Sequence, residues 1–188
     1  MALYRHGRIV TNDDWIFVQP GEQVPAHGHV ALRRDAWLAS RAALAGRAPA
    51  IGLVLASDES LAPILSDLPY LGLIALEFPR FTDGRAYSLA RMLRQTHGYG
   101  GELRARGDVL RDQIKLLLRA GFDALELADP DTIAALRDGR IVSVSRHYQT
   151  AATAPSSSRP YERSDGIFGW RRQSDPIPPA GSGGFLTG

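Results

Sequence analysis

The chain has 188 residues, of which 44% are hydrophobic and 22% are charged. These values are typical of a globular protein with room for one domain and an appendage. The 22 basic and 20 acidic residues give a formal charge of only +2, so the composition predicts neither a nucleic-acid nor a membrane partner. The chain has no cysteine, which excludes disulfides, thiol catalysis and iron–sulfur clusters held by its own thiolates.

The sequence favours a cytoplasmic protein whose positive charge is almost all arginine. Residues 1–15 are polar and lack the apolar stretch of a signal peptide. No window approaches the roughly 18 apolar residues that a membrane span needs. Lys115 is the only lysine. Arginine suits the planar, bidentate binding of oxyanions and carboxylates, so an anionic ligand is the first to consider.

The first thirty residues predict a small β-ribbon that packs on the main domain. Leu3 and Tyr4 on one side and residues 8–10 on the other flank a turn at His6 and Gly7. A second apolar run, residues 15–18, ends before Pro20. Residues 33–45 then show helical spacing of apolar side chains, and Gly46 follows them.

From residue 50 onward, short apolar runs alternate with helical patterns. The runs predict strands at residues 51–55, 73–78, 102–105, 124–127 and 141–145. Helices are predicted to begin near Asp58, Asp83, Asp108 and Asp129, and Gly121 ends the third of them. This alternation predicts an α/β fold with a mainly parallel sheet of repeated βα units. An open sheet and a partial barrel both fit the pattern.

The composition changes after residue 149. Residues 150–188 are rich in Ser, Pro and Gly, which is typical of a disordered tail. We therefore expect a single α/β domain over residues 1–149, with the β-ribbon at about residues 1–30.

Charged side chains gather in three consecutive turns of the predicted sheet, at residues 57–59, 78–88 and 104–113. Ligands of parallel α/β sheets bind at the carboxyl ends of the strands, where helix N-termini also point. The candidate ligand-binding residues are Arg80, Asp83, Arg85, Arg104, Arg106 and Asp108. Two alternatives stay open: the aspartates can serve only as helix caps, and the arginines can pair internally with Asp83, Asp108 and Asp112.

Several familiar sites are absent from the sequence. The glycines of residues 98–101 follow a predicted helix and precede a strand, which is the reverse of a dinucleotide-binding loop. The five histidines are scattered, so no metal site is predicted, and no cofactor is evident. Glu77 and Glu126 lie near strand ends, and we interpret them as salt-bridge partners.

The motifs at residues 78–91, 98–105 and 107–113 resemble one bacterial family. Its members are described as oxidoreductases involved in sulfite reduction and are encoded beside assimilatory sulfite reductase. The resemblance covers roughly residues 1–149 and implies a role in sulfate assimilation. It carries no catalytic residues over to this chain.

The resemblance and the residues together leave two functional hypotheses. A redox enzyme needs an electron carrier, and the sequence shows neither cysteines nor a dinucleotide loop to hold one. We therefore favour an accessory protein that binds sulfite reductase, or a sulfur oxyanion through the arginines. The alternative is an oxidoreductase or other enzyme that acts directly on an anionic substrate, with Asp83 or Asp108 as the acid–base group.

Overall fold

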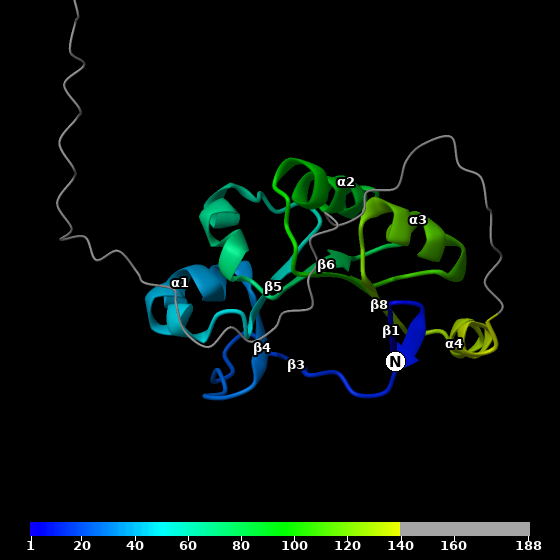
Figure 1. Ribbon diagram of the computed structural model, residues 1–188, viewed down its shortest axis with the longest axis horizontal. Helices are drawn as coiled ribbons and strands as arrows, with labels where there is room; N and C mark the ends of the chain where they lie inside the picture. Colours follow the sequence, from blue (N-terminus) through cyan, green and yellow to red (C-terminus); the bar gives the residue numbers. More distant parts are fainter. Residues whose placement is uncertain (140–188) are drawn as a thin grey trace, which may run out of the picture. The chain divides into compact units, whose positions relative to one another are not determined.

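The apolar runs from residue 51 onward form the centre of an eight-stranded sheet. The structure is a computed structural model that describes residues 1–139 (Figure 1). The central strands are β5 (Ile51–Leu55), β6 (Leu73–Phe78), β7 (Glu102–Gly107) and β8 (Ala124–Leu127). Nearly all residues of β5, β6 and β8 are buried, and the three residues Leu103, Arg104 and Ala105 are buried in β7, as expected for the centre of a parallel sheet.

The strand order is β2-β1-β8-β7-β6-β5-β4-β3. Strands β3 (Trp15–Phe17) through β8, including β4 (His29–Arg33), run parallel in sequential order. Strand β1 (Ala2–Arg5) pairs antiparallel with β8 and with β2 (Arg8–Val10). The sheet curls but remains open, as a half-barrel, so the predicted α/β class and mainly parallel sheet are confirmed.

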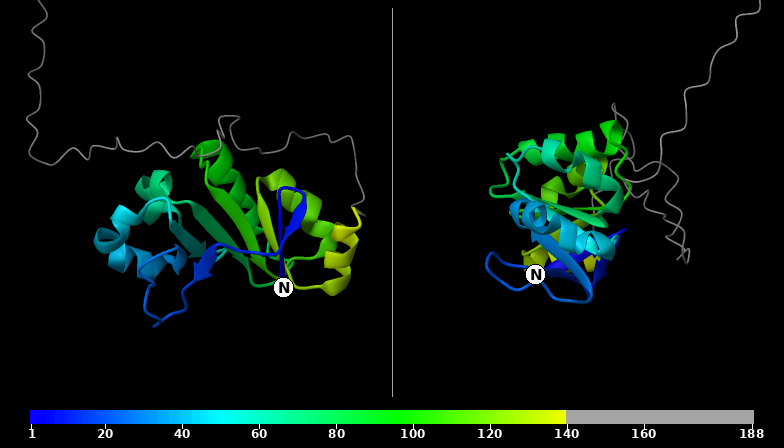
Figure 2. Two further views of the ribbon diagram at one scale, coloured as in Figure 1. Left: turned by 60° about the horizontal axis from the view of Figure 1, so that its bottom comes forward. Right: turned by 90° about the vertical axis from the view of Figure 1, so that its left-hand side faces the viewer.

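The helices connect the strands and are short. Figures 1 and 2 show α2 and α3 side by side over one face of the sheet. The α-helices are α1 (Arg34–Leu44), α2 (Arg85–Arg91), α3 (Ile114–Ala120) and α4 (Pro130–Arg137). The tighter turns η1 (Ala45–Arg47), η2 (Ala62–Tyr70) and η4 (Arg111–Gln113) are 3₁₀-helical, and η3 (Met92–Thr96) is a π-helical turn that extends α2.

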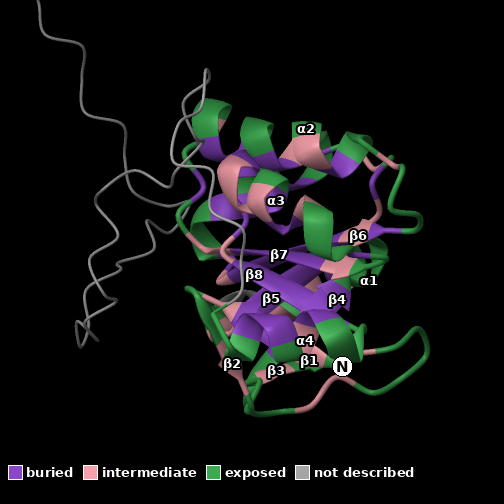
Figure 3. Cartoon of the chain, turned by 90° about the vertical axis from the view of Figure 1, so that its right-hand side faces the viewer, coloured by how far each residue is buried: buried purple, intermediate pink, exposed green. Residues whose placement is uncertain are grey.

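The central strands are largely buried (Figure 3), and each face of the sheet packs a different apolar cluster. Alternate residues of the strands meet the helices in the larger core, whose fully buried members include Leu53, Leu76 and Leu103. The opposite, inner face carries a smaller cluster of Ala31, Val54, Leu73 and Ala75, against which Trp15 and Phe17 pack. A side chain on Gly52 would meet Leu73 and Trp15 at about 3 Å, so this close packing requires glycine.

The N-terminal segment is arranged differently from the predicted ribbon. The hairpin of β1 and β2 forms as expected, but it extends one edge of the main sheet instead of packing on it. Strand β3 lies at the opposite edge, and Figures 1 and 2 show the chain between β2 and β3 running along the face away from α2 and α3. We call residues 11–20 the N-terminal strap. Strand β4 was not predicted, because the helical pattern of α1 follows it without a break.

Two of the predicted helix starts are confirmed and two are wrong. Asp129 accepts backbone hydrogen bonds from Asp131 and Thr132 at the start of α4, and Gly121 ends α3 with φ 105°. Asp83 accepts from the backbone N–H of Arg85 at the start of α2. Asp58 caps no helix, because η2 begins only at Ala62, and Asp108 precedes η4 without capping it.

The predicted last strand at residues 141–145, the domain end at residue 149 and the tail at residues 150–188 lie outside the described residues. Within residues 1–139, no helix is long and apolar enough to cross a membrane.

Candidate functional site

A cavity of about 700 Å³ opens at the carboxyl ends of the central strands. Parallel strands in sequential order bring these ends to one edge of the sheet, where ligands of α/β proteins bind. The N-terminal strap forms the wall across from the strands. The lining comprises Met1, Phe17, Val18, Gln19, Pro20, Arg33, Val54, Ala56, Ser57, Asp58, Glu77, Phe78, Pro79, Arg85, Arg106, Gly107, Asp108 and Glu126.

Strand alternation places the charged part of this lining on the inner face. Leu76 and Phe78 join the helix-covered core, so Glu77 between them points the other way. The parallel register puts Arg106 of β7 beside Glu77 of β6. Arg106 and Glu77 therefore lie on neighbouring strands of the same face, close to the strand ends.

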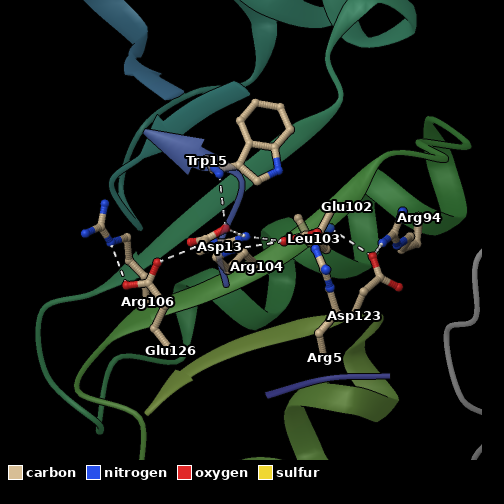
Figure 4. A network of polar contacts seen from close by, with 10 residues as sticks. All are labelled: Arg5, Asp13, Trp15, Arg94, Glu102, Leu103, Arg104, Arg106, Asp123 and Glu126. Atoms are coloured by element: carbon tan, nitrogen blue, oxygen red, sulfur yellow. Dashed lines mark hydrogen bonds and ion pairs between the residues drawn. The ribbon is translucent and has the colours of Figure 1, made fainter. Parts of the chain in front are cut away.

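Arg104, two residues before Arg106, lies deeper on the inner face and is fully occupied by carboxylates (Figure 4). Its side chain is 0% exposed. It pairs with Asp13 of the strap at 2.5 Å, with Glu102 at 2.7 Å and with Glu126 at 3.5 Å. A guanidinium with three carboxylate partners has no donor left for a ligand, so Arg104 is a structural ion-pair centre.

The ion pair between Arg104 and Asp13 ties the strap to the sheet. Burial raises the pKa of Asp13, but the hydrogen bonds and charge of Arg104 outweigh it and hold the pKa below its ordinary value. Burial lowers the pKa of Arg104, but hydrogen bonds to and the charges of Asp13 and Glu102 outweigh it and raise the pKa above its ordinary value. Both groups therefore stay charged, and the strap keeps its position over the inner face.

Arg106 is held on two sides and open on a third. Its Nε donates to Glu126 at 3.0 Å, and its guanidinium carbon lies 3.9 Å from the centre of the Phe17 ring. Among residues 1–139, no hydrogen-bond partner is found for its two terminal nitrogens, and its side chain is 24% exposed along the cavity. Such an oriented guanidinium can bind an oxyanion through two parallel N–H groups.

Arg85 provides a second cation at the rim of the cavity. Its Nε and Nη2 donate to the carboxylate of Asp83 at 3.0 and 2.7 Å, while Nη1 lies 3.9 Å from Asp58. Hydrogen bonds from Arg85 and from the Ser57 hydroxyl hold the pKa of Asp83 well below its ordinary value. Asp83 thus stays ionised near neutral pH and orients Arg85.

Asp108 shapes the third turn. One of its oxygens accepts the backbone N–H of Phe81 at 2.9 Å, and its own N–H donates to the Phe78 carbonyl. Gly107 has φ 102°, and a Cβ there would lie 2.4 Å from the Phe78 carbonyl oxygen. Only glycine fits this close approach of two strand ends. Asp108 is also among the residues that line the cavity.

The structure separates the six residues that the sequence singled out. Arg85, Arg106 and Asp108 line the cavity. Asp83 lies behind Arg85, Arg104 lies beneath Arg106, and Arg80 is exposed outside the lining. Internal ion pairs, predicted as an alternative, do form. Arg85 pairs with Asp83 as predicted. The partners of Arg104 and Arg106 are instead carboxylates that were not predicted for them: Asp13, Glu102 and Glu126.

Sequence reasoning missed the strap, which supplies the cavity wall through residues 17–20. No local pattern links the strap to β7, because Asp13 and Arg104 are 91 residues apart.

Glu77 and Glu126 are salt-bridge partners, as interpreted from the sequence. Glu77 pairs with Arg33. Glu126 pairs with both Arg104 and Arg106. Glu77 and Glu126 also line the cavity. Within the part of the chain that the structure describes, no group of three His, Asp or Glu side chains is placed to hold a metal ion.

The fold and the cavity define a class of protein: an open, sequentially wound α/β half-barrel with a polar pocket at the carboxyl ends of its strands. The chain belongs to a bacterial family of unknown function, DUF934, whose model matches residues 52–158, more than half of the chain. No curated protein and no solved structure matches the chain. The matched segment begins in β5 and contains all of the charged lining residues except Arg33.

Proposed function

We propose that the chain is an accessory protein of assimilatory sulfate and sulfite reduction that binds an oxyanion-bearing ligand in the cavity at the strand ends. The observation that carries the binding site is Arg106, which lines the cavity with two uncommitted guanidinium nitrogens. The motifs at residues 78–91, 98–105 and 107–113 support the link to sulfite reduction, because they resemble a family encoded beside sulfite reductase.

Arg106 is suited to this role because its orientation is fixed before a ligand arrives. Glu126 holds Nε, and Phe17 covers one face of the guanidinium. Pre-organisation reduces the side-chain entropy that is lost on binding, so more of the interaction energy appears as affinity. Arg85, oriented by Asp83, is the second anion-binding group at the rim. Arg104 contributes only by holding Glu126 and the strap.

Calorimetric titration of the full chain with sulfite and with sulfate tests the anion site. We expect binding that weakens at least about tenfold in Arg106→Met, because a charged hydrogen-bond donor is removed. Arg91→Met is the matched control: Arg91 is exposed on α2 and does not line the cavity, so its variant should bind as the wild type does. Equal affinities of the two variants for the anion would refute the assignment.

Growth of a deletion strain on sulfate, sulfite or cysteine as the sole sulfur source tests the pathway. Failure on sulfate and on sulfite, with rescue by cysteine, would place the protein at sulfite reduction. Co-purification of the full chain with sulfite reductase then tests the partner directly. Normal growth on all three sources would refute the role in sulfur assimilation and leave the anion site as a separate result.

A second candidate function is an enzyme that acts directly on an anionic substrate. The favouring observation is that Asp108 and Glu77 line the same cavity as Arg106, so carboxylates lie where an anion-bearing substrate would bind. Turnover by the purified chain, lost in Asp108→Asn but retained in the exposed-site variant Asp35→Asn, would favour the enzyme over the accessory protein.

A further inference from the structure

Several carboxylate oxygens of the cavity lining are not used in hydrogen bonds within the described chain. Glu77 Oε2 is paired with Arg33, and Asp108 Oδ2 accepts the Phe81 N–H. For the second carboxylate oxygen of each, no hydrogen bond is found among residues 1–139. Asp58 has only a 3.9 Å ion pair with Arg85, and its side chain is 65% exposed. Three carboxylates that line the cavity thus each retain an unused acceptor oxygen.

Acidic and basic groups are mixed in the lining. Four acidic residues and three arginines line the cavity together with Met1 at the N-terminus, so acidic and basic groups are nearly balanced. Two of the guanidinium groups, Arg33 and Arg106, are already paired with Glu77 and Glu126. A bare, doubly charged oxyanion would meet Arg106 favourably and the remaining carboxylates unfavourably.

The size of the cavity adds a third constraint. At about 700 Å³ it lies within the usual range of small-molecule sites, and a bare sulfite or sulfate ion would fill only a small part of it. Apolar side chains complete the lining, with Phe17, Val54 and Pro79 among them. The space beyond Arg106 therefore suits an organic body with polar groups on one side.

From these three observations we infer the class of the ligand, on the basis of the proposed anion site: a small organic molecule that joins one oxyanion group to a body bearing hydroxyl or amino hydrogen-bond donors. Arg106 binds the oxyanion. Glu77 and Asp108 accept hydrogen bonds from the body, which satisfies oxygens that a bare anion would leave unused. The apolar side chains contact the carbon skeleton.

Calorimetric titration of the full chain with three probes tests this inference. Inorganic phosphate represents the bare oxyanion, ribose 5-phosphate adds hydroxyl donors, and phosphoserine adds an amino donor. We expect at least one of the organic probes to bind about tenfold or more tightly than phosphate, since each hydrogen bond to a charged acceptor contributes that much. The tighter of the two identifies the donor type.

Two variants separate this inference from the proposed anion site. Glu77→Gln should remove most of the advantage of the organic probe while phosphate binds at least as tightly as before, and the exposed variant Asp35→Asn should change neither. Arg106→Met should weaken all three probes. If phosphate binds in an Arg106-dependent manner but no organic probe binds more tightly, the ligand class is wrong and the anion site stands. If no probe binds, or if Arg106→Met leaves binding intact, both are overturned.

Discussion

The ion-pair centre beneath the cavity gives the sharpest stability prediction, for Arg104→Met. The substitution keeps much of the side-chain volume but removes the shared partner of three carboxylates, whose side chains are 32% (Asp13), 15% (Glu102) and 8% (Glu126) exposed. Removing one partner of a buried ion pair costs about 3–5 kcal/mol. Glu102 keeps Arg5 and Glu126 keeps Arg106, so we expect a loss near the lower end, about 3 kcal/mol.

Urea unfolding followed by tryptophan fluorescence measures this loss, since Trp15 lies on β3 two residues after Asp13. Asp13→Asn should cost less, about 1.5–3 kcal/mol, because Arg104 retains two carboxylates. The double variant should lose less than the sum of the single variants, since the two residues are in direct contact. Arg91→Met, on the exposed side of α2, should lie within about 0.5 kcal/mol of the wild type. A loss below about 1 kcal/mol for Arg104→Met would refute the view of Arg104 as a buried structural centre.

Three further predictions follow from local geometry. Gly107→Ala should destabilise the fold by more than about 1 kcal/mol, since residue 107 has a positive φ and its Cβ would clash with a backbone carbonyl. Gly100→Ala is the control and should not destabilise the fold, because the space around its Cβ is open. Equal urea midpoints of the two variants would contradict this prediction. The pKa of Asp83 in the folded protein lies below its ordinary value of 3.8. The ionised carboxylate therefore contributes fully to stability above pH 3.8, and this contribution is lost as the pH falls through the pKa of the folded state. Asp83→Asn should therefore flatten the decline of the urea midpoint between pH 5 and pH 2; an unchanged slope would speak against the ionised carboxylate. Asp129→Ala should cost about 1 kcal/mol by removing the cap of α4, and Asp129→Ser should recover most of it.

The sequence alone determined the alternation of strands and helices from residue 51 onward. The runs at 51–55, 73–78 and 124–127 are short, apolar and bounded by polar turns, so local composition was enough to place β5, β6 and β8. The cap at Asp129 and the stop at Gly121 were also predictable, because each depends only on neighbouring backbone groups. The predicted position of the charged turns at the carboxyl ends of the strands follows from the same alternation.

Only the tertiary structure decided what the charged residues do. Arg104 and Arg106 are two residues apart on one strand and face the same way, yet one is a buried ion-pair centre and the other lines the cavity. The difference comes from Asp13, which lies 91 residues earlier and reaches Arg104 only because β3 joins the far edge of the sheet. A sequence pattern records spacing along the chain, whereas the partners of a guanidinium depend on which distant segments the fold brings to it.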